Sequence, residues 1–205
     1  MAGVRLGLLG PAGDDLATLA RAAEFLLNDA KVTRAIYLGA DDALEETVAL
    51  WAESLVGSDA SDDGLWNRAF RVAAEGSPDQ IDGFLRGERA RLRLKALESL
   101  PATELRSVEM FGDRVAVLIN DKALLDEEDI FSATFLVYGR SDSPLIKKIG
   151  PRWFLTPGPI GSEGGGALVL DDGNDEVVAT LYDSEGREAS TQVLTTERAA
   201  KLSVR

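Results

Sequence analysis

The side chains that most often carry catalysis are missing from this sequence. Its 205 residues include no histidine and no cysteine. Without histidine there is no imidazole base, no imidazole metal ligand and no Ser-His-Asp triad, and without cysteine there is no thiolate nucleophile, thiolate metal site or disulfide. Carboxylates remain, and a site made only of oxygen ligands would suit a hard cation such as Mg²⁺ or Ca²⁺. Water in such a site would have to be activated without histidine, for instance by an aspartate of raised pKa.

Two pairs of aspartates precede helical patterns. Asp14 and Asp15 follow one short apolar run, and Asp41 and Asp42 follow a second. At the start of a helix an aspartate side chain accepts hydrogen bonds from free amides and favours the positive end of the helix. We therefore expect both pairs to be helix caps, and we expect Asp142 to be a turn residue.

Glycines around the first strand-to-helix turn suggest a nucleotide site only weakly. Gly7, Gly10 and Gly13 have the spacing GxxGxxG rather than the GxGxxG of dinucleotide-binding proteins. The next strand ends at residues 37–39 without the acidic residue that would bind a ribose hydroxyl. The glycine-rich segment 161–166 has no lysine or serine placed as in a P-loop. No cofactor is expected.

A basic run stands out in an otherwise acidic chain. It consists of Arg86, Arg89, Arg91, Arg93 and Lys95. The run could pair with an acidic partner, but a solvated helix face is the simpler expectation, since no aromatic residues alternate with it as in a nucleic-acid site.

Aromatic residues in the same half of the chain have two interpretations. Core packing is the expectation for each of Trp51, Trp66, Phe70 and Phe84. The alternative is an exposed patch of aromatic anchors for another protein. The candidate protein-binding residues are then Trp66, Phe70, Phe84, Arg86, Arg89 and Arg93.

Composition limits the class of protein further. The formal net charge is −13 and 45% of the residues are hydrophobic. Nucleic-acid binders concentrate Lys and Arg, so nucleic acid is not an expected partner. Residues 1–10 do not resemble a leader peptide, and no run approaches 18 apolar residues, so we expect a cytoplasmic protein without a membrane span. The length favours one domain with a sizeable core.

Strands and helices alternate at the start of the chain. Val4–Leu9 and Ala35–Leu38 are short apolar runs that end near glycine and are typical of buried strands. A helix with apolar residues from Leu16 to Leu27 follows the first strand, and Leu44–Leu55 predicts a second helix. Right-handed crossovers would make the two strands parallel neighbours.

The rest of the chain divides into a helical and a strand-rich part. Residues 58–100 predict a helix over Leu65–Ala74 and a long charged helix from about Asp79 to Ser99. Beyond Pro101 the predicted strands are Leu105–Met110, Arg114–Ile119, Thr134–Tyr138, Arg152–Leu155, Ala167–Leu170, Val177–Tyr182 and Glu188–Leu194. An α/β layered sheet protein follows from this order.

The turn sequences resemble those of the calcineurin-like metallophosphoesterases, in particular the small single-domain phosphodiesterase branch. The family's first strand enters a helix through Ser-Asp-x-His-Gly-Asn, and here the turn reads GPAGDD over residues 10–15. Its second strand ends Leu-Gly-Asp, and here Leu38-Gly39-Ala40. Its late Tyr-Gly-His-Thr-His-x-Pro and Asn-Pro-Gly-Ser motifs align with residues 138–144 and 156–159, which read YGRSDSP and TPGP. The family frame implies a four-layer α/β/β/α sandwich of two mixed sheets over residues 1–205, with a helical insertion at about 58–100.

The same resemblance implies that the family's pair of metal ions has lost its ligands. The positions that carry Asp and His in the family hold Pro11, Gly13, Ala40, Asn120, Arg140 and Asp142 here. Proline and alanine have no ligand side chain, and a guanidinium beside a metal position would repel a cation. Neither a metal nor catalysis is then expected.

Three functions remain open on this basis. The first is a non-catalytic protein that serves as a protein-interaction or regulatory scaffold, as the metal-free retromer subunit of this fold does, with another protein or a second copy as partner. The second is a divergent hydrolase in which Asp41, Asp142 and Asn120 hold a hard cation. The third is a metal-free pocket in which Arg140 binds the phosphate or carboxylate of a small anion.

Overall fold

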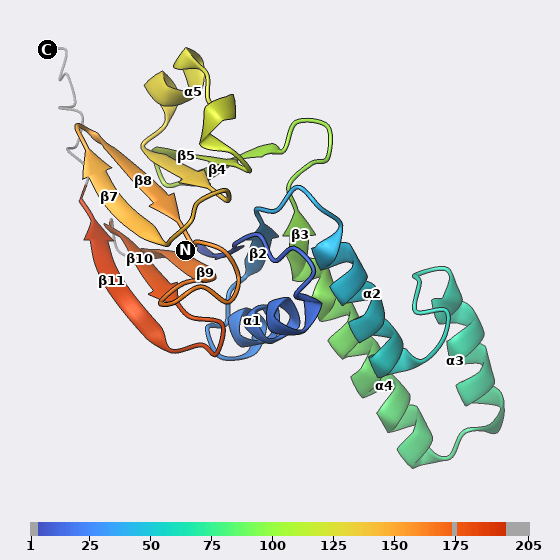
Figure 1. The fold of residues 1–205 in the computed structure, drawn as a ribbon. Coiled ribbons are helices and arrows are strands. Elements are labelled where there is room, and N and C mark those ends of the chain that lie inside the picture. The colour runs from blue at the N-terminus through green and yellow to red at the C-terminus, as the bar shows by residue number, and fades with distance from the viewer. Residues whose placement is uncertain (1–3, 174–175, 196–205) are drawn as a thin grey trace, which may run out of the picture.

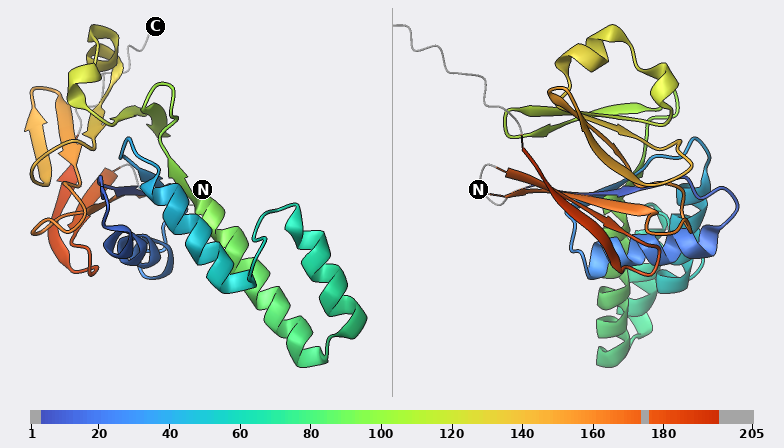
Figure 2. Two further views of the ribbon diagram at one scale, coloured as in Figure 1. Left: turned by 45° about the vertical axis from the view of Figure 1, so that its right-hand side comes forward. Right: turned by 60° about the vertical axis from the view of Figure 1, so that its left-hand side comes forward.

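Two β-sheets form the body of the protein in a computed structural model, which describes residues 4–173 and 176–195. Sheet A has the strand order β11-β10-β9-β1-β2-β3, and sheet B has the order β4-β5-β6-β8-β7. The strands of sheet A are β1 (Arg5–Leu9), β2 (Arg34–Tyr37), β3 (Leu97–Ser99), β9 (Ala167–Gly173), β10 (Glu176–Tyr182) and β11 (Glu188–Leu194). Those of sheet B are β4 (Arg106–Phe111), β5 (Arg114–Ile119), β6 (Phe135–Tyr138), β7 (Leu145–Ile149) and β8 (Arg152–Thr156). Figure 2 shows the two sheets stacked on each other.

Both sheets are mixed, as the family resemblance implies. In sheet A, β1, β2 and β3 are parallel, whereas β9 pairs antiparallel with β1 and continues into the β9-β10-β11 meander. In sheet B, β5, β6 and β8 are parallel, and the edge strands β4 and β7 are antiparallel to their neighbours. The fold is therefore α/β, with the central strands of both sheets parallel and the edges antiparallel.

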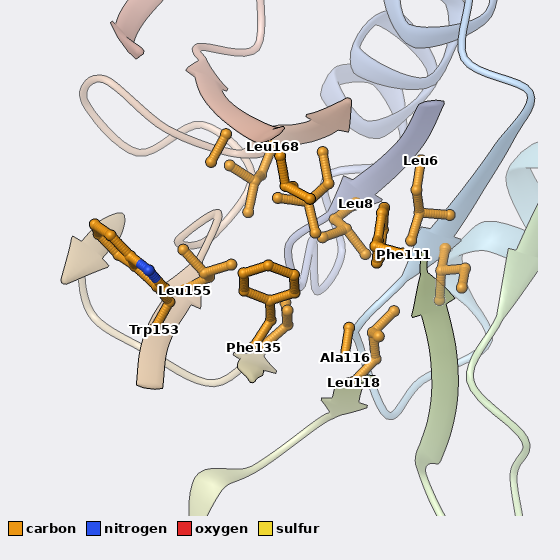
Figure 3. Packing of buried hydrophobic residues seen from close by; sticks show 14 of the residues in the cluster. Leu6, Leu8, Phe111, Ala116, Leu118, Phe135, Trp153, Leu155 and Leu168 are labelled. Carbon is orange, nitrogen blue, oxygen red and sulfur yellow. The ribbon is translucent and has the colours of Figure 1, made fainter. Parts of the chain in front are cut away.

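The main core lies between the sheets, where alternate side chains of facing strands meet. Figure 3 shows Leu6, Leu8 and Leu168 of sheet A opposite Phe135 and Leu155 of sheet B. All five are at most 2% exposed. Strands buried on both faces read as continuous apolar runs, which explains why β1 could be recognised from its sequence.

Helices cover the outer faces of both sheets. The helices α1 (Leu16–Asn28) and α2 (Ala43–Val56) cover sheet A, and their buried side chains share a second core with Leu9, Tyr37 and Val169. The outer face of sheet B carries only the 3-10 turn η2 (Lys122–Leu124) and the short helix α5 (Glu127–Ser132), close to a small cluster of Val117, Ala133 and Leu136. Helix, sheet, sheet and helix make four layers, of which the last is thin (Figure 1).

Residues 58–96 form a projection, which we call the helical arm and whose ends pack on the body through Ala60, Leu94 and Ala96. It contains α3 (Gly64–Glu75), α4 (Pro78–Arg93) and the 3-10 turn η1 (Leu94–Ala96). Helix α4 begins with a complete capping box, in which Ser77 and Gln80 each bind the other's backbone amide. Figures 1 and 2 show α3 and the start of α4 standing clear of both sheets.

The helix predicted from Asp79 to Ser99 is shorter than expected. Helix α4 ends at Arg93, and Leu97–Ser99 forms strand β3, which pairs with Ala35, Ile36 and Tyr37 of β2. A sequence of high helix propensity becomes a strand here because hydrogen bonds to β2 and burial of Leu97 outweigh local preference.

Candidate functional site

Turns at the carboxyl ends of parallel strands are the first candidate site. These turns follow β1 and β2 in sheet A and β5 and β6 in sheet B, and they carry every position that the family resemblance assigned to metal ligands. The two sheets meet there, because the Asn120 Nδ2 atom donates a hydrogen bond of 2.7 Å to the carbonyl oxygen of Leu38. The Arg140 amide in turn donates to the Asn120 carbonyl oxygen at 2.7 Å.

Tyr37, which the sequence analysis did not single out, links two of these turns. Its ring is fully buried, and its hydroxyl oxygen accepts a hydrogen bond from the Ala12 amide at 2.9 Å. The same hydroxyl donates to the Asp41 Oδ1 atom at 2.7 Å. Burial and the neighbouring Asp41 carboxylate raise the pKa of Tyr37 above its usual value, so the phenol stays protonated. The side chain therefore ties the β1–α1 turn to the β2–α2 turn.

Glycines allow the same turns to pack backbone against backbone. A Cβ atom on Gly10 would lie 1.8 Å from the carbonyl oxygen of Gly158, and one on Gly139 would lie 2.3 Å from that of Leu38. Real Cβ atoms do not approach oxygen so closely, so only glycine fits at either position. The turns are therefore held directly against one another.

Arg140 is already paired. One terminal nitrogen of its guanidinium lies 2.9 Å from the Asp121 Oδ2 atom, although most of the Arg140 side chain is exposed. The Ala123 amide and the Arg140 guanidinium hold the pKa of Asp121 below its usual value. An anion at this place would compete with a carboxylate of the protein itself.

The donor set around these turns does not fit a two-metal centre. Within the described residues, no group of three or more His, Cys, Asp or Glu side chains is placed to hold a metal ion. Pro11, Gly13 and Ala40 offer no side-chain donor. The Asn120 amide nitrogen is engaged with Leu38, and Asp142 lies exposed in a bend.

The two aspartate pairs include the expected caps. The Asp15 side chain accepts from the Thr18 amide at 3.1 Å, and this interaction lowers the pKa of Asp15. Asp41 accepts from the Ala43 amide at 3.2 Å, at the first residue of α2. Asp42 stands at the N-cap of α2 without a side-chain hydrogen bond to the helix, and Asp14 is exposed.

The helical arm is the second candidate site, and its aromatic residues differ from expectation. Core packing was expected for Trp66 and Phe70, but each is 77% exposed. They stand four residues apart on α3, so they are neighbours on one helix face, opposite the buried Arg68. Trp51 packs against the core as expected, and Phe84 is half-buried. Exposed aromatic pairs of this kind are typical of protein-binding surfaces.

An ion-pair network holds α3 against α4. The Glu88 carboxylate accepts from Arg68 Nε and from Arg91 Nε, each at 2.7 Å, and all three side chains are buried. Arg91 also pairs with Asp62 at 2.8 Å, and Asp62 with Lys95 at 2.5 Å. Burial by itself would raise the pKa of Glu88, but the hydrogen bonds from the two arginines outweigh it and the pKa is lowered.

The basic run is therefore only in part the solvated face that the sequence predicts. Arg86 and Arg89 are exposed, and no hydrogen bond or ion pair is found for either in the described part of the chain. Arg91 is buried in the network, and Arg93 binds the Leu27 carbonyl oxygen and the Asn28 Oδ1 atom at the end of α1. Spacing alone could not distinguish these roles, because Asp62, the second acidic partner of Arg91, and the carbonyl partner of Arg93 lie 29 and 66 residues away in the sequence.

No helix among the described residues is long and apolar enough to cross a membrane. No protein-family model matches the chain, and no curated protein matches it.

Solved structures do resemble it. A conserved uncharacterized protein of Streptococcus pneumoniae, described as a predicted phosphoesterase, aligns over 96% of this chain and 99% of its own, with 13% identity and a TM-score of 0.51. Vps29 of Chaetomium thermophilum aligns over 95% of this chain and all of its own, with 13% identity and a TM-score of 0.49. A novel archaeal phosphodiesterase aligns over 93% and 99%, with 12% identity and a TM-score of 0.46. With its two mixed sheets between helices, the protein has the calcineurin-like metallophosphoesterase fold.

Proposed function

We propose that the protein is a non-catalytic phosphoesterase-like scaffold that binds another protein through its helical arm. The observation that carries this proposal is the exposed pair Trp66 and Phe70 on the outermost helix of the projection. Burying aromatic area of this kind releases about 25 cal/mol per Å², so leaving it in water is costly unless a partner covers it. A regulatory role through that partner, in the cytoplasm, is part of the proposal.

The strand-end turns support the non-catalytic part of the proposal. Their polar groups are satisfied by one another, through the Tyr37 hydroxyl, the Asn120 amide and the Arg140–Asp121 pair. The hydrolase alternative would need Asp41 as a ligand, and one of its two carboxylate oxygens, Oδ1, already accepts from Tyr37 and from the Ala43 amide. The anion-binding alternative would need Arg140, which is paired.

Affinity purification from extract of the source cells tests the proposal. Wild-type protein is compared with the double variant Trp66→Ser/Phe70→Ser and with Phe131→Ser. Phe131 is 85% exposed on α5, away from the arm, so its replacement removes a similar apolar surface elsewhere. We expect a partner that binds wild type and Phe131→Ser but is lost from the double variant. Equal recovery by all three proteins would contradict the proposal.

Charge-reversal variants provide a second test of the same proposal. Arg86→Glu and Arg89→Glu alter exposed side chains without a partner in the described chain, and they are expected to weaken recovery of an acidic partner. Arg93→Glu is less suitable, because Arg93 also ties α4 to the end of α1.

A further inference from the structure

A pocket of about 540 Å³ lies at the base of the helical arm, and we call it the basal pocket. Its lining comes from α2, from the loop 57–63 that leads into α3, and from the end of α4 with the short segments that follow it. Figure 1 shows α2 and the later half of α4 side by side there. Trp66 and Phe70 are not among the residues that line the pocket, so it is a surface separate from the exposed aromatic pair.

One wall of the basal pocket is apolar. Val48, Ala49 and Ala52 of α2 belong to it, together with Leu94 and Leu97 from the chain that follows α4. Ala49 is exposed, so this wall is open to solvent. The alanine side chains are small and leave room beside α2. Such a wall suits the methylene groups of a long side chain whose charged end stays near water.

Three carboxylates in the lining have no cationic partner in the described part of the chain. Glu45 and Glu53 are exposed, and no hydrogen bond or ion pair is found for either side chain. The Asp59 carboxylate accepts from the Ser61 hydroxyl at 2.7 Å. These three groups are therefore available to a cation from outside.

The sequence explains this excess of negative charge. Residues 35–67 contain eight aspartates and glutamates and neither lysine nor arginine. Among the described residues only Asp62 of these eight forms an ion pair, with Arg91 and Lys95 from the end of the arm. The acidic segment thus carries much of the net charge of −13 and supplies the carboxylates of the pocket.

The two cations of the lining do not cancel this charge. Arg91 pairs with Glu88 and Asp62, and Lys95 pairs with Asp62. When the whole ion-pair network is counted with the lining, five carboxylates face three cations. The carboxylates are Glu45, Glu53, Asp59, Asp62 and Glu88, and the cations are Arg68, Arg91 and Lys95. A cationic ligand is therefore complementary to the pocket.

One buried donor in the lining has no acceptor. Arg91 is 6% exposed, and its Nε and Nη1 atoms bind Glu88, Asp62 and the Ala60 carbonyl oxygen. Its Nη2 atom is buried, and no hydrogen-bond partner is found for it among the described residues. A buried donor without an acceptor is costly, so an oxygen atom of the ligand would stabilise this side chain. An extended peptide has free backbone carbonyls, whereas those within a helix are already bonded.

We propose that the basal pocket binds an extended segment of another protein that carries two basic side chains four residues apart, with an apolar residue midway between them. Glu45 and Glu53 are eight residues apart on α2, which is roughly 12 Å. Residues i, i+2 and i+4 of an extended chain lie on one face over about 13 Å. The basic side chains would pair with the two glutamates, and the apolar one would lie against Val48 and Ala52. A backbone carbonyl of the segment would accept from Arg91.

This site goes beyond the proposed function, because it is a second binding surface that involves neither aromatic residue of the exposed pair. A second copy of the chain is the less suitable occupant, since each copy brings a net charge of −13 to an acidic surface.

Phage display tests the proposal without knowledge of the natural partner. Random peptides of about nine residues, roughly 30 Å long when extended, are selected on the wild-type protein and in parallel on Glu45→Gln/Glu53→Gln. We expect the wild type to enrich peptides with Lys or Arg at i and i+4 and an apolar residue at i+2, and the double variant not to do so. Failure of the wild type to enrich such peptides, or their equal enrichment on both proteins, would overturn the proposal.

A synthetic peptide from the enriched set then gives affinities by fluorescence anisotropy. Glu45→Gln/Glu53→Gln is expected to weaken binding by about tenfold, through the loss of two ion pairs. Glu24→Gln/Glu46→Gln is the matched control: it removes the same charge from exposed residues outside the lining and should bind within about twofold of wild type. Equal weakening by the two double variants would show that only net charge matters and would contradict the assignment.

Filling the pocket provides a test that leaves the charge unchanged. Ala49→Leu places a larger side chain on the apolar wall and is expected to weaken peptide binding by at least about tenfold, whereas Ala49→Ser should bind within about twofold of wild type. Thermal unfolding establishes that each variant is folded. Wild-type affinity of a folded Ala49→Leu protein would mean that the peptide binds elsewhere.

Two further outcomes separate this inference from its alternatives. Trp66→Ser/Phe70→Ser should bind the peptide as the wild type does, even when it loses the cellular partner, and loss of peptide binding would place the peptide on the aromatic pair instead. Spermidine should compete far less well than the unlabelled peptide, because it offers neither the apolar residue nor the carbonyl. Equal competition would assign the pocket to a small cation and contradict a peptide segment.

Discussion

Single residues decide what the strand-end turns can do. In a metallophosphoesterase these turns present ligands to a pair of metals; here Tyr37 and Asn120 use their polar atoms to fasten the turns together. A hydrogen-bonded phenol with a raised pKa is a structural group at neutral pH. Substitutions of Tyr37 and Asn120 are therefore expected to lower the free energy of unfolding.

Tyr37→Phe tests that role. The variant keeps the buried ring and removes the hydroxyl, which leaves the Ala12 amide and the Asp41 carboxylate without this partner. We expect a loss of about 1–2 kcal/mol in the free energy of unfolding, measured by urea denaturation. Tyr138→Phe is the control, since no hydrogen bond of the Tyr138 hydroxyl is found in the described chain, and its effect should stay within about 0.5 kcal/mol. Equal effects of the two variants would contradict a specific role for the Tyr37 hydroxyl.

Two glycine substitutions should have opposite signs. Gly10→Ala places a methyl group where the Gly158 carbonyl oxygen already lies, so we expect a loss of at least about 3 kcal/mol or a failure to fold. Gly83→Ala lies within α4 with free space around it, and helix propensity predicts a gain of about 0.8–1 kcal/mol. Denaturation midpoints measure both changes, and a stable Gly10→Ala protein would show that the turns are not in contact.

Whole elements show where reasoning from sequence succeeds and where it fails. The strands β1, β5 and β6 were predictable because apolar runs between turn residues can only be buried. The helix α3 was predictable as a helix, but its orientation was not, because both its outward aromatics and its inward Arg68 depend on a partner helix twenty residues further along the chain. Helical periodicity shows that a helix has an apolar and a polar face. Which of the two is buried depends on the element that packs against the helix.

The docking of α3 depends on one carboxylate. Glu88 accepts from both Arg68 and Arg91, so Glu88→Gln would leave the buried Arg68 guanidinium without its counter-charge and Arg91 with Asp62 alone. Breaking one partner of a buried ion pair costs about 3–5 kcal/mol, which corresponds to a loss of at least about 100-fold in the amide protection of α3. Hydrogen–deuterium exchange measures this, with α1 as the internal reference and Glu75→Gln as the matched control. Unchanged protection in Glu88→Gln would mean that the network is not what holds α3.

The same carboxylate makes the arm sensitive to acid. The pKa of Glu88 in the folded protein lies below its ordinary value of 4.5, so its contribution is complete above pH 4.5 and disappears as the pH falls through the folded-state pKa. We expect the protection of α3, corrected for the intrinsic exchange rate, to decrease below pH 4.5 while that of α1 decreases less. A parallel decrease in both helices would indicate global unfolding instead.

At the scale of the whole molecule, the two-sheet body and the helical arm differ in the roles that we propose for them. The body keeps the phosphoesterase-like fold, and the order of its turns was predictable from the sequence because the turns retain the glycines and prolines of that fold. The contacts that hold those turns together could not be predicted. The hydrogen bonds and ion pair of Tyr37, Asn120 and Arg140 join segments that are separated in the chain. The arm carries the surface for which we propose a partner.

The central claim, a scaffold without a metal-dependent reaction, is tested most directly by thermal unfolding of chelator-treated protein with and without millimolar Mg²⁺, Mn²⁺, Ca²⁺ or Zn²⁺. A ligand of the native state present at 100 times its dissociation constant stabilises by about 2.7 kcal/mol. For a chain of this size, such stabilisation raises the unfolding midpoint by roughly 5–10 °C. We expect the same midpoint with every metal, within about 1 °C. A rise of several degrees with one metal that Asp142→Ala abolishes would contradict it and would identify a working cation site at the strand-end turns.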